Sequence, residues 1–231
     1  MKKNVYLIFF CILLFNSCSK DIAKNPITTK IKTQITTIIN EGVPGNTAEN
    51  LLSRIDSVIE LKPNLVIIMI GTNDAIDGIS TYNSYTTTLS IIIDSLKNSG
   101  ASVMLLTPPP VQAWNTITKN INELNGICSM IYNLSVSKGC YYVDINSDFN
   151  NIITLSNSHQ LYYTDGLHPS SAGYADIAKY ICAYLKMNNI SVSKIICFGD
   201  SITYGAYMVG AGTNTGNTYP AFLKEDLNSN N

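Results

Sequence analysis

Several short polar blocks along the chain contain the side chains that acyl transfer requires. They are Gly-Asp-Ser-Ile-Thr (199–203), Gly-Thr-Asn-Asp (71–74), Gly-Val-Pro-Gly-Asn-Thr (42–47) and Tyr-Thr-Asp-Gly-Leu-His-Pro (163–169). A serine hydroxyl is a poor nucleophile and needs a base within hydrogen-bond reach, a role that suits histidine because its pKa lies near neutrality. The chain has two histidines, His159 and His168. A multi-histidine metal site is therefore excluded, and a histidine base must be one of these two.

Apolar runs indicate the strands that must position these blocks. Four runs are apolar at consecutive positions, which is typical of parallel strands covered on both faces. They span residues 64–70, 101–107, 140–145 and 194–198. A fifth run, residues 34–39, is more polar and is expected at an edge of the sheet.

Helical patterns separate these runs. One apolar stripe has Asn46 and Glu49 as its predicted capping box and consists of Leu51, Leu52, Ile55, Val58 and Ile59. Further helices are expected over residues 82–98, 118–137 and 171–187. The alternation predicts an α/β fold that is doubly wound and flavodoxin-like, with a five-stranded parallel sheet between two helical layers. Its site should lie beyond the carboxyl ends of the strands.

The blocks resemble the conserved blocks of the SGNH (GDSL-type) hydrolases, and the resemblance covers nearly all of residues 31–231. It implies the SGNH-hydrolase fold and a serine esterase mechanism without a cofactor or metal. Ser201 is then the nucleophile, His168 the base and Asp165 the residue that orients the base. The implied oxyanion hole consists of the backbone N–H groups of Ser201 and Gly45 and the side-chain amide of Asn73.

Each of these residues also has a purely structural interpretation. Ser201 could be a helix N-cap, Gly45 a turn residue, Asn73 a hydrogen-bonding partner for nearby backbone and His168 an ordinary loop histidine. Asp74 and Asp200 are expected to brace loops, and Asp74 with Asp77 is a weak candidate for a metal or glycosidase pair. The joint occurrence of the four blocks favours the catalytic interpretation.

The order of the blocks departs from the family. In the family the serine block comes first, whereas here the order is Gly45, Asn73, Asp165 with His168, and finally Ser201. Because the cyclic order is intact, we expect a circular permutation in which residues 188–193 connect the former termini. A domain swap between two copies is the alternative.

The chain's composition restricts its partners. Lys and Arg total 15 and Asp and Glu total 16, a net charge of -1, so no basic surface is expected for nucleic acid. Charged residues are 13% of the chain, which suits a neutral partner such as a glycan but equally fits the composition of an AT-rich genome. A small acyl ester or an acetylated glycan is the expected substrate. Trp114 and Tyr204 are candidates for substrate contacts, with packing within a loop as the alternative for Trp114. Tyr207 and Tyr219 also flank the serine block, and the same two interpretations apply to them.

The resemblance implies hydrolysis of carboxylic esters through an acyl-enzyme, and we expect a carbohydrate O-acetyl esterase. One alternative is a lysophospholipase or thioesterase that acts on longer acyl chains. The other is a catalytically inactive, glycan-binding lipoprotein on the same scaffold.

The first residues predict export. Two lysines and a short apolar run make residues 1–17 a signal peptide, and Cys18 is the expected lipidation site of a bacterial lipoprotein. Residues 18–30 form the expected tether and residues 31–231 a single hydrolase domain. We expect a periplasmic, outer-membrane or cell-surface location, with membrane contact only through the lipid anchor. Whether Cys182 and Cys197 form a disulfide stays open.

Overall fold

The computed structural model describes residues 35–112, 121–156 and 163–229, with backbone alone at 79–83, 121 and 154–156. Residues Thr33–Asn231 form one compact unit. The predicted signal peptide (1–17), Cys18, the tether (18–30), Trp114 and His159 lie outside the described residues.

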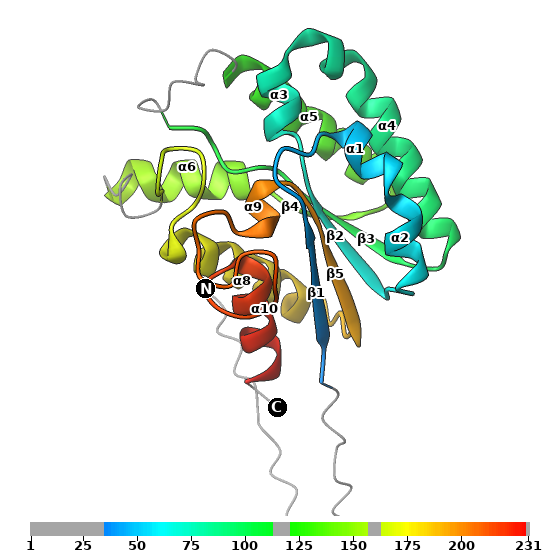
Figure 1. Cartoon of the computed structure of the whole chain (residues 1–231), viewed down its shortest axis with the longest axis vertical. Coiled ribbons are helices and arrows are strands. Elements are labelled where there is room, and N and C mark those ends of the chain that lie inside the picture. The colour runs from blue at the N-terminus through cyan, green and yellow to red at the C-terminus, as the bar shows by residue number, and fades with distance from the viewer. Residues whose placement is uncertain (1–34, 113–120, 157–162, 230–231) are drawn as a thin grey trace, which may run out of the picture. The chain divides into compact units, whose positions relative to one another are not determined.

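Five parallel strands form a single sheet with the order β1-β5-β2-β3-β4 (Figure 1). The strands are β1 (Thr37–Gly42), β2 (Leu65–Met69), β3 (Ser102–Leu106), β4 (Tyr141–Val143) and β5 (Lys194–Gly199). The predicted five-stranded parallel sheet is confirmed, and its most polar strand, β1, lies at an edge as expected. The strand before Ser201, β5, is internal and pairs with β1 and β2.

Two apolar cores, one on each face of the sheet, make the fold three-layered. In β2, Leu65 and Ile67 pack into one core, while Val66 and Ile68 pack into the other. The first core contains residues of α6 (Ile145–Ser156), α8 (Ser171–Met187) and α10 (Tyr219–Asn228). The second contains residues of α1 (Ala48–Ser53), α2 (Ile55–Glu60), α3 (Thr72–Asp77), α4 (Ile79–Asn98) and α5 (Ile121–Lys138). β2 is buried at every position, and β3 and β5 are buried at every position but the first, which explains their continuous apolar runs.

The first strand and helix differ from their predicted bounds. The predicted strand over 34–39 is displaced, because pairing with β5 starts at Thr37 and continues to Gly42. The predicted capping box is also displaced by one residue: Thr47 is the N-cap, and its N–H donates to the side chain of Asn50 at 2.9 Å. The predicted single helix is divided at Arg54 into α1 and α2.

The later helices agree better with the sequence. The helix predicted over 171–187 is confirmed as α8, and α4 begins three residues before the predicted start at 82. The run over 140–145 yields only the short β4, because α6 begins at Ile145. The sequence predicted no helix at α3 or α6, and it predicted a helix after β5 without bounds, where the structure has α9 (Ser201–Tyr204) and α10. None of the described helices is long and apolar enough to cross a membrane.

Two further features concern chain connectivity. Near the end of α10, the side chain of Asn228 accepts from the Thr36 N–H at 2.9 Å and donates to the Thr36 carbonyl at 3.1 Å. The last helix is therefore fastened to the start of β1. Cys182 and Cys197 are both buried free cysteines in the described structure.

Candidate active site

Three side chains predicted from the sequence form one hydrogen-bonded row. Nε2 of His168 lies 3.0 Å from Oγ of Ser201, and its Nδ1 lies 2.8 Å from Oδ2 of Asp165. Ser201 is the first residue of α9, directly after β5, whereas Asp165 and His168 precede α8. The N-cap of α9 is Asp200, so the interpretation of Ser201 as the N-cap is wrong.

The surroundings of Asp165 keep it ionised. Burial acts to raise its pKa, but bonds from the backbone N–H and ring of His168 and from the Leu167 N–H outweigh burial, so the pKa lies below its usual range. The two backbone bonds end on Oδ1, at 2.9 Å from Leu167 and 2.7 Å from His168. The other oxygen is left to accept from Nδ1 of His168. A proton on Nδ1 leaves Nε2 free to accept the proton of Ser201.

The loop that carries the acid and the base is held at both ends. Thr164 donates its N–H to the His168 carbonyl at 2.9 Å, and Tyr163 and Pro169 form an antiparallel bridge. The hydroxyl of the buried Tyr163 donates to the Pro110 carbonyl at 2.6 Å, which ties the loop to the segment after β3. The imidazole is therefore presented from a fixed backbone.

The predicted oxyanion donors lie on the neighbouring loops. The Asn73 side chain donates one N–H to the Asn46 carbonyl at 2.8 Å, which leaves the other N–H of that amide for a ligand. Gly45 is exposed, with a φ of 80° that favours glycine. Within the described part of the chain, the backbone N–H groups of Gly45 and Ser201 have no hydrogen-bond acceptor.

Two buried aspartates brace these loops, as expected. Asp74 accepts from the Ala48 N–H at 3.0 Å, and Asp200 accepts from the Ile202 N–H at 2.8 Å. Burial is the main cause that raises the pKa of Asp74 to about 6 and of Asp200 to about 7. The carboxylates of Asp77 and Glu49 also raise the pKa of Asp74, and that of Asp74 raises the pKa of Asp200. In the described residues, no group of three or more His, Cys, Asp or Glu side chains is placed to hold a metal ion.

Arg54 is a residue of the site's framework that the sequence reasoning missed. Its Nη2 donates to the carbonyls of Glu41 at 2.9 Å and Gly199 at 3.0 Å, and its Nε donates to Oδ1 of Asn46 at 2.8 Å. Burial lowers the pKa of Arg54, which the carboxylate of Glu41 opposes. Arg54 thus joins the ends of β1 and β5 to the loop that carries Gly45. The available signal was that it is the only arginine in the chain.

The three tyrosines near Ser201 have different surroundings. Tyr219 is fully buried, with its hydroxyl 3.3 Å from Oγ1 of Thr203. The half-buried Tyr204 packs its ring over Gly212, where an added Cβ would lie 2.6 Å from Cε2 of the ring. Tyr207 is 70% exposed, and its ring contacts that of His168 edge-to-face at 5.2 Å between centroids. Only Tyr207 of the three is in ring contact with the catalytic row.

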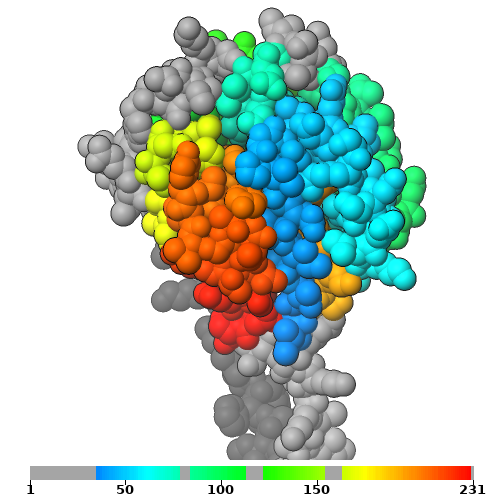
Figure 2. Space-filling view, in the orientation of Figure 1, coloured from blue at the N-terminus to red at the C-terminus, as the bar shows by residue number. Residues whose placement is uncertain are grey.

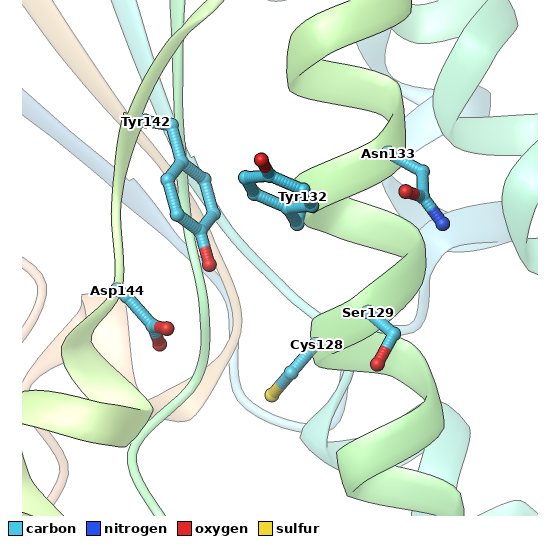
Figure 3. Close-up of a pocket in the computed structure, with 6 residues that line it drawn as sticks. All are labelled: Cys128, Ser129, Tyr132, Asn133, Tyr142 and Asp144. Carbon is cyan, nitrogen blue, oxygen red and sulfur yellow. The ribbon is translucent and has the colours of Figure 1, made fainter.

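A cavity of about 350 Å³ lies elsewhere, between α5 and β4 (Figure 3). It is lined by Cys128, Ser129, Tyr132, Asn133, Tyr142 and Asp144. The carboxylate of Asp144 already accepts from the Thr107 hydroxyl at 2.8 Å and from the Ser147 N–H at 3.1 Å. None of the six lining residues belongs to the triad or to the predicted oxyanion donors.

A family comparison agrees with this geometry. Residues 27–175 match the model of the GDSL-like lipase/acylhydrolase family. The matched region contains Gly45, Asn73, Asp165 and His168 and ends before Ser201. No curated protein sequence matches the chain significantly.

Solved structures with a similar fold include esterases. Axe2, an acetylxylan esterase from Geobacillus stearothermophilus, is 24% identical with a TM-score of 0.53, over 61% of this chain and 68% of its own. The acetyl xylan esterase AlAXEase is 19% identical with a TM-score of 0.57, over 62% and 77%. A lipase/acylhydrolase from Enterococcus faecalis is 23% identical with a TM-score of 0.54, over 63% and 73%. The chain belongs to the GDSL-like lipase/acylhydrolase family, and it is a carboxylic ester hydrolase.

Proposed function

We propose that the protein is a carbohydrate O-acetyl esterase in which Ser201, His168 and Asp165 are the catalytic triad. The observation that carries the triad is the row of hydrogen bonds from Asp165 through His168 to Ser201, at 2.8 Å and 3.0 Å. A serine, a histidine and an ionised aspartate in this row are the groups that nucleophilic acyl transfer requires.

The reaction proceeds in two stages, formation of an acyl-enzyme and its hydrolysis. Oγ of Ser201 attacks the ester carbonyl carbon while its proton passes to Nε2 of His168. The tetrahedral intermediate then breaks the bond to the alcohol oxygen, which takes the proton from Nε2 and leaves. Water repeats the sequence on the acyl-enzyme: it gives a proton to Nε2 and adds to the carbonyl, and Ser201 recovers its proton as the carboxylic acid departs.

The negative charge of the tetrahedral intermediate is stabilised by three donors. The backbone N–H groups of Ser201 and Gly45 and the second N–H of the Asn73 amide are proposed to bind the oxyanion. Because Asn46 fixes the other hydrogen of that amide, the donor is oriented before the substrate arrives. Donors held in advance are effective, and the loss of one typically costs about 3 kcal/mol of transition-state stabilisation.

Three observations support a carbohydrate acetyl ester as the substrate. Two of the similar structures are named as acetylxylan esterases. Charged residues are only 13% of the sequence, which suits a neutral ligand. An exposed aromatic ring, that of Tyr207, lies against His168. Trp114 and Tyr204 stay candidates for substrate contacts.

The test is a panel of acetylated glycans, p-nitrophenyl acetate and p-nitrophenyl octanoate, assayed with the parent and with Ser201→Ala. We expect the parent to release acetate from the glycans and to prefer acetate to octanoate. A preference for octanoate or longer esters would support a lysophospholipase or thioesterase instead. Glycan binding without ester turnover would support the inactive lipoprotein.

We also propose that residues 1–17 are a signal peptide and that Cys18 carries lipid, which places the enzyme in the periplasm or at the outer membrane or cell surface. This proposal rests on the sequence. In cells, radioactive palmitate should label the parent, and the protein should sediment with membranes. The variant Cys18→Ser should lose both the label and the sedimentation, and an unlabelled parent would contradict the proposal.

Circular permutation is our proposal for the order of the blocks. Counting β5 as the first strand changes the sheet order from β1-β5-β2-β3-β4 to 2-1-3-4-5, the flavodoxin-like order. The bonds between Asn228 and Thr36 hold α10 beside the start of β1, so the two segments that a rearranged chain would join lie close together. A family match that ends before Ser201 is also what a linear comparison gives for a permuted chain.

The permutation has a direct test. A rearranged chain that starts at Ser193 and joins Asn231 to Thr33 should fold as an active monomer, because every contact of the domain is retained. An inactive, unfolded product would contradict the permutation. Activity confined to a dimer would favour the domain swap.

A further inference from the structure

Tyr207 has a backbone conformation that is uncommon for its residue type. Its φ is 67°, in the left-handed region that glycine and asparagine adopt more readily than tyrosine. Unfavourable conformations of this kind persist where the surrounding structure enforces them, and they concentrate at functional sites. Burial of the side chain does not explain this backbone conformation, because Tyr207 is 70% exposed.

The segment that contains Tyr207, residues 205–218, is held by hydrogen bonds within itself and to β1. Within it, the Asn217 N–H donates to the Val209 carbonyl at 2.8 Å, and the Gly212 N–H donates at 2.7 Å to the carbonyl of Tyr204, which directly precedes the segment. Toward β1, the Asn40 side chain donates to the Thr213 carbonyl at 3.0 Å and the Asn214 side chain donates to the Ile38 carbonyl at 2.5 Å. In Figure 2 the orange atoms of this segment lie directly against the blue atoms of the region that contains β1.

This bracing presents the Tyr207 ring to the catalytic base. The rings of Tyr207 and His168 meet edge-to-face, with 5.2 Å between centroids and 78° between planes. The side chain of His168 is only 12% exposed, whereas most of the Tyr207 ring faces solvent. A ligand beside His168 would therefore meet an aromatic surface.

The proposed mechanism indicates which half of the ester, acyl or alcohol, lies beside His168 and Tyr207. His168 gives its proton to the oxygen of the departing alcohol, so that oxygen must come within hydrogen-bond distance of Nε2. The carbonyl oxygen points to the donors of Ser201, Gly45 and Asn73 instead. Because the Tyr207 ring contacts the His168 ring, the alcohol half is the part of the substrate that can reach Tyr207.

We propose that Tyr207 is the specificity residue that binds the sugar ring of the alcohol half, an inference that rests on the proposed carbohydrate function. An aromatic ring offers a large, rigid apolar surface with a hydroxyl at its edge, which matches a ring that has apolar C–H faces and hydroxyl groups. Val209, in the same segment, and Val43, after β1, are also exposed apolar side chains. Residues 205–218 contain no Asp, Glu, Lys or Arg, so the segment suits a neutral ligand.

The test compares two acetate esters that differ only in the alcohol. An acetylated xylo-oligosaccharide has a sugar ring to contact Tyr207, and ethyl acetate has none. The main variant is Tyr207→Asn, because asparagine tolerates the left-handed backbone and the loop should keep its fold. Tyr207→Phe retains the ring. Tyr132→Ala is the matched control, because it removes an exposed tyrosine whose ring contacts Tyr142 and not His168. Thermal unfolding of each variant verifies that it is folded.

We expect Tyr207→Asn to lower kcat/KM for the oligosaccharide by about tenfold, mainly through KM, and to leave ethyl acetate unchanged. Tyr207→Phe should retain most of the activity on the oligosaccharide, and Tyr132→Ala should match the parent. The inference is overturned if Tyr207→Asn leaves the ratio of the two kcat/KM values unchanged. That ratio is unchanged either if neither rate falls or if both fall together, as they would if the ring only positioned His168.

The proposed function has a separate readout in the same experiment. If the parent hydrolyses the acetylated oligosaccharide no better than ethyl acetate, the carbohydrate function fails, and this inference fails with it. If the parent prefers the oligosaccharide and Tyr207→Asn keeps that preference, only the role of Tyr207 is wrong.

Discussion

Replacing Arg54 by methionine should weaken the framework under the active site. The side chain donates to two carbonyls, those of Glu41 and Gly199, and to the side chain of Asn46, at 2.8 to 3.0 Å. Its guanidinium also lies 4.4 Å from the centroid of the Phe198 ring. Arg54→Met keeps an unbranched apolar stem and removes the guanidinium, and with it all of these interactions.

The expected loss of stability can be worked out from these contacts. A hydrogen bond from a charged donor contributes roughly 1.5 to 3 kcal/mol, and a cation–π contact contributes about 1 kcal/mol. Two facts reduce the sum: the Arg54 side chain is 21% exposed, and the Gly199 carbonyl keeps a second donor, the Val43 N–H at 3.1 Å. We therefore expect Arg54→Met to lower the free energy of unfolding by about 3 kcal/mol. The free energy of unfolding of Arg54→Lys should lie between those of the parent and Arg54→Met, because one ammonium cannot reach three acceptors.

Activity should also fall, because Asn46 links Arg54 to the oxyanion donor. When Asn46 loses its bond to Arg54, its carbonyl holds the Asn73 amide less firmly. We expect kcat for an acetate ester to fall about tenfold in Arg54→Met with little change in KM.

Guanidinium chloride unfolding and steady-state kinetics measure both effects. Lys138→Met is the matched control, since it removes an exposed ion pair with Asp94 that typically contributes less than about 1 kcal/mol. If Arg54→Met destabilises the protein no more than Lys138→Met does, the reasoning about the framework is refuted.

Three further predictions concern the oxyanion hole, helix packing and pH. Asn73→Ala should lower kcat by about 10²- to 10³-fold at unchanged KM, and a loss of less than about tenfold would contradict its role. Gly42→Ala should destabilise the fold by about 3 kcal/mol, because the new Cβ would lie 2.1 Å from the Tyr204 backbone nitrogen; unaltered thermal unfolding would refute this. Since Asp200 has a pKa raised to about 7, the folded state binds its proton more tightly than the unfolded state does. Stability should therefore fall as the pH rises from about 4 to about 7, and Asp200→Asn should flatten that fall in chemical unfolding; an equally steep curve would be contrary evidence.

The sequence predicted most of the fold because burial on both faces leaves a clear pattern. The strand before Ser201 is apolar at consecutive positions, and α8 has an amphipathic pattern with Ser170 as its N-cap. The bounds of β1 were missed because Asn40 and Glu41 are polar residues in an edge strand. Their pairing with β5 depends on residues more than 150 positions away in the chain. Local patterns carry no information about such pairing.

The site was predicted in part for a related reason. Ser201, His168, Asp165 and Asn73 stand in recognisable blocks, and the structure brings the first three into one hydrogen-bonded row. Arg54 was missed because its partners are mainly backbone carbonyls, which any sequence supplies. The contact of Tyr207 with His168 depends on a left-handed backbone at a tyrosine, which residue type does not predict.

The central claim is that Ser201 attacks the ester, and the rate of acetate release at saturating substrate tests it most directly. The parent and Ser201→Ala would be compared on the same acetate ester, after thermal unfolding has established that both are folded. The triad geometry predicts that kcat of Ser201→Ala is at least about 10³-fold below that of the parent. Equal rates for the two proteins would contradict the assignment of Ser201 as the nucleophile.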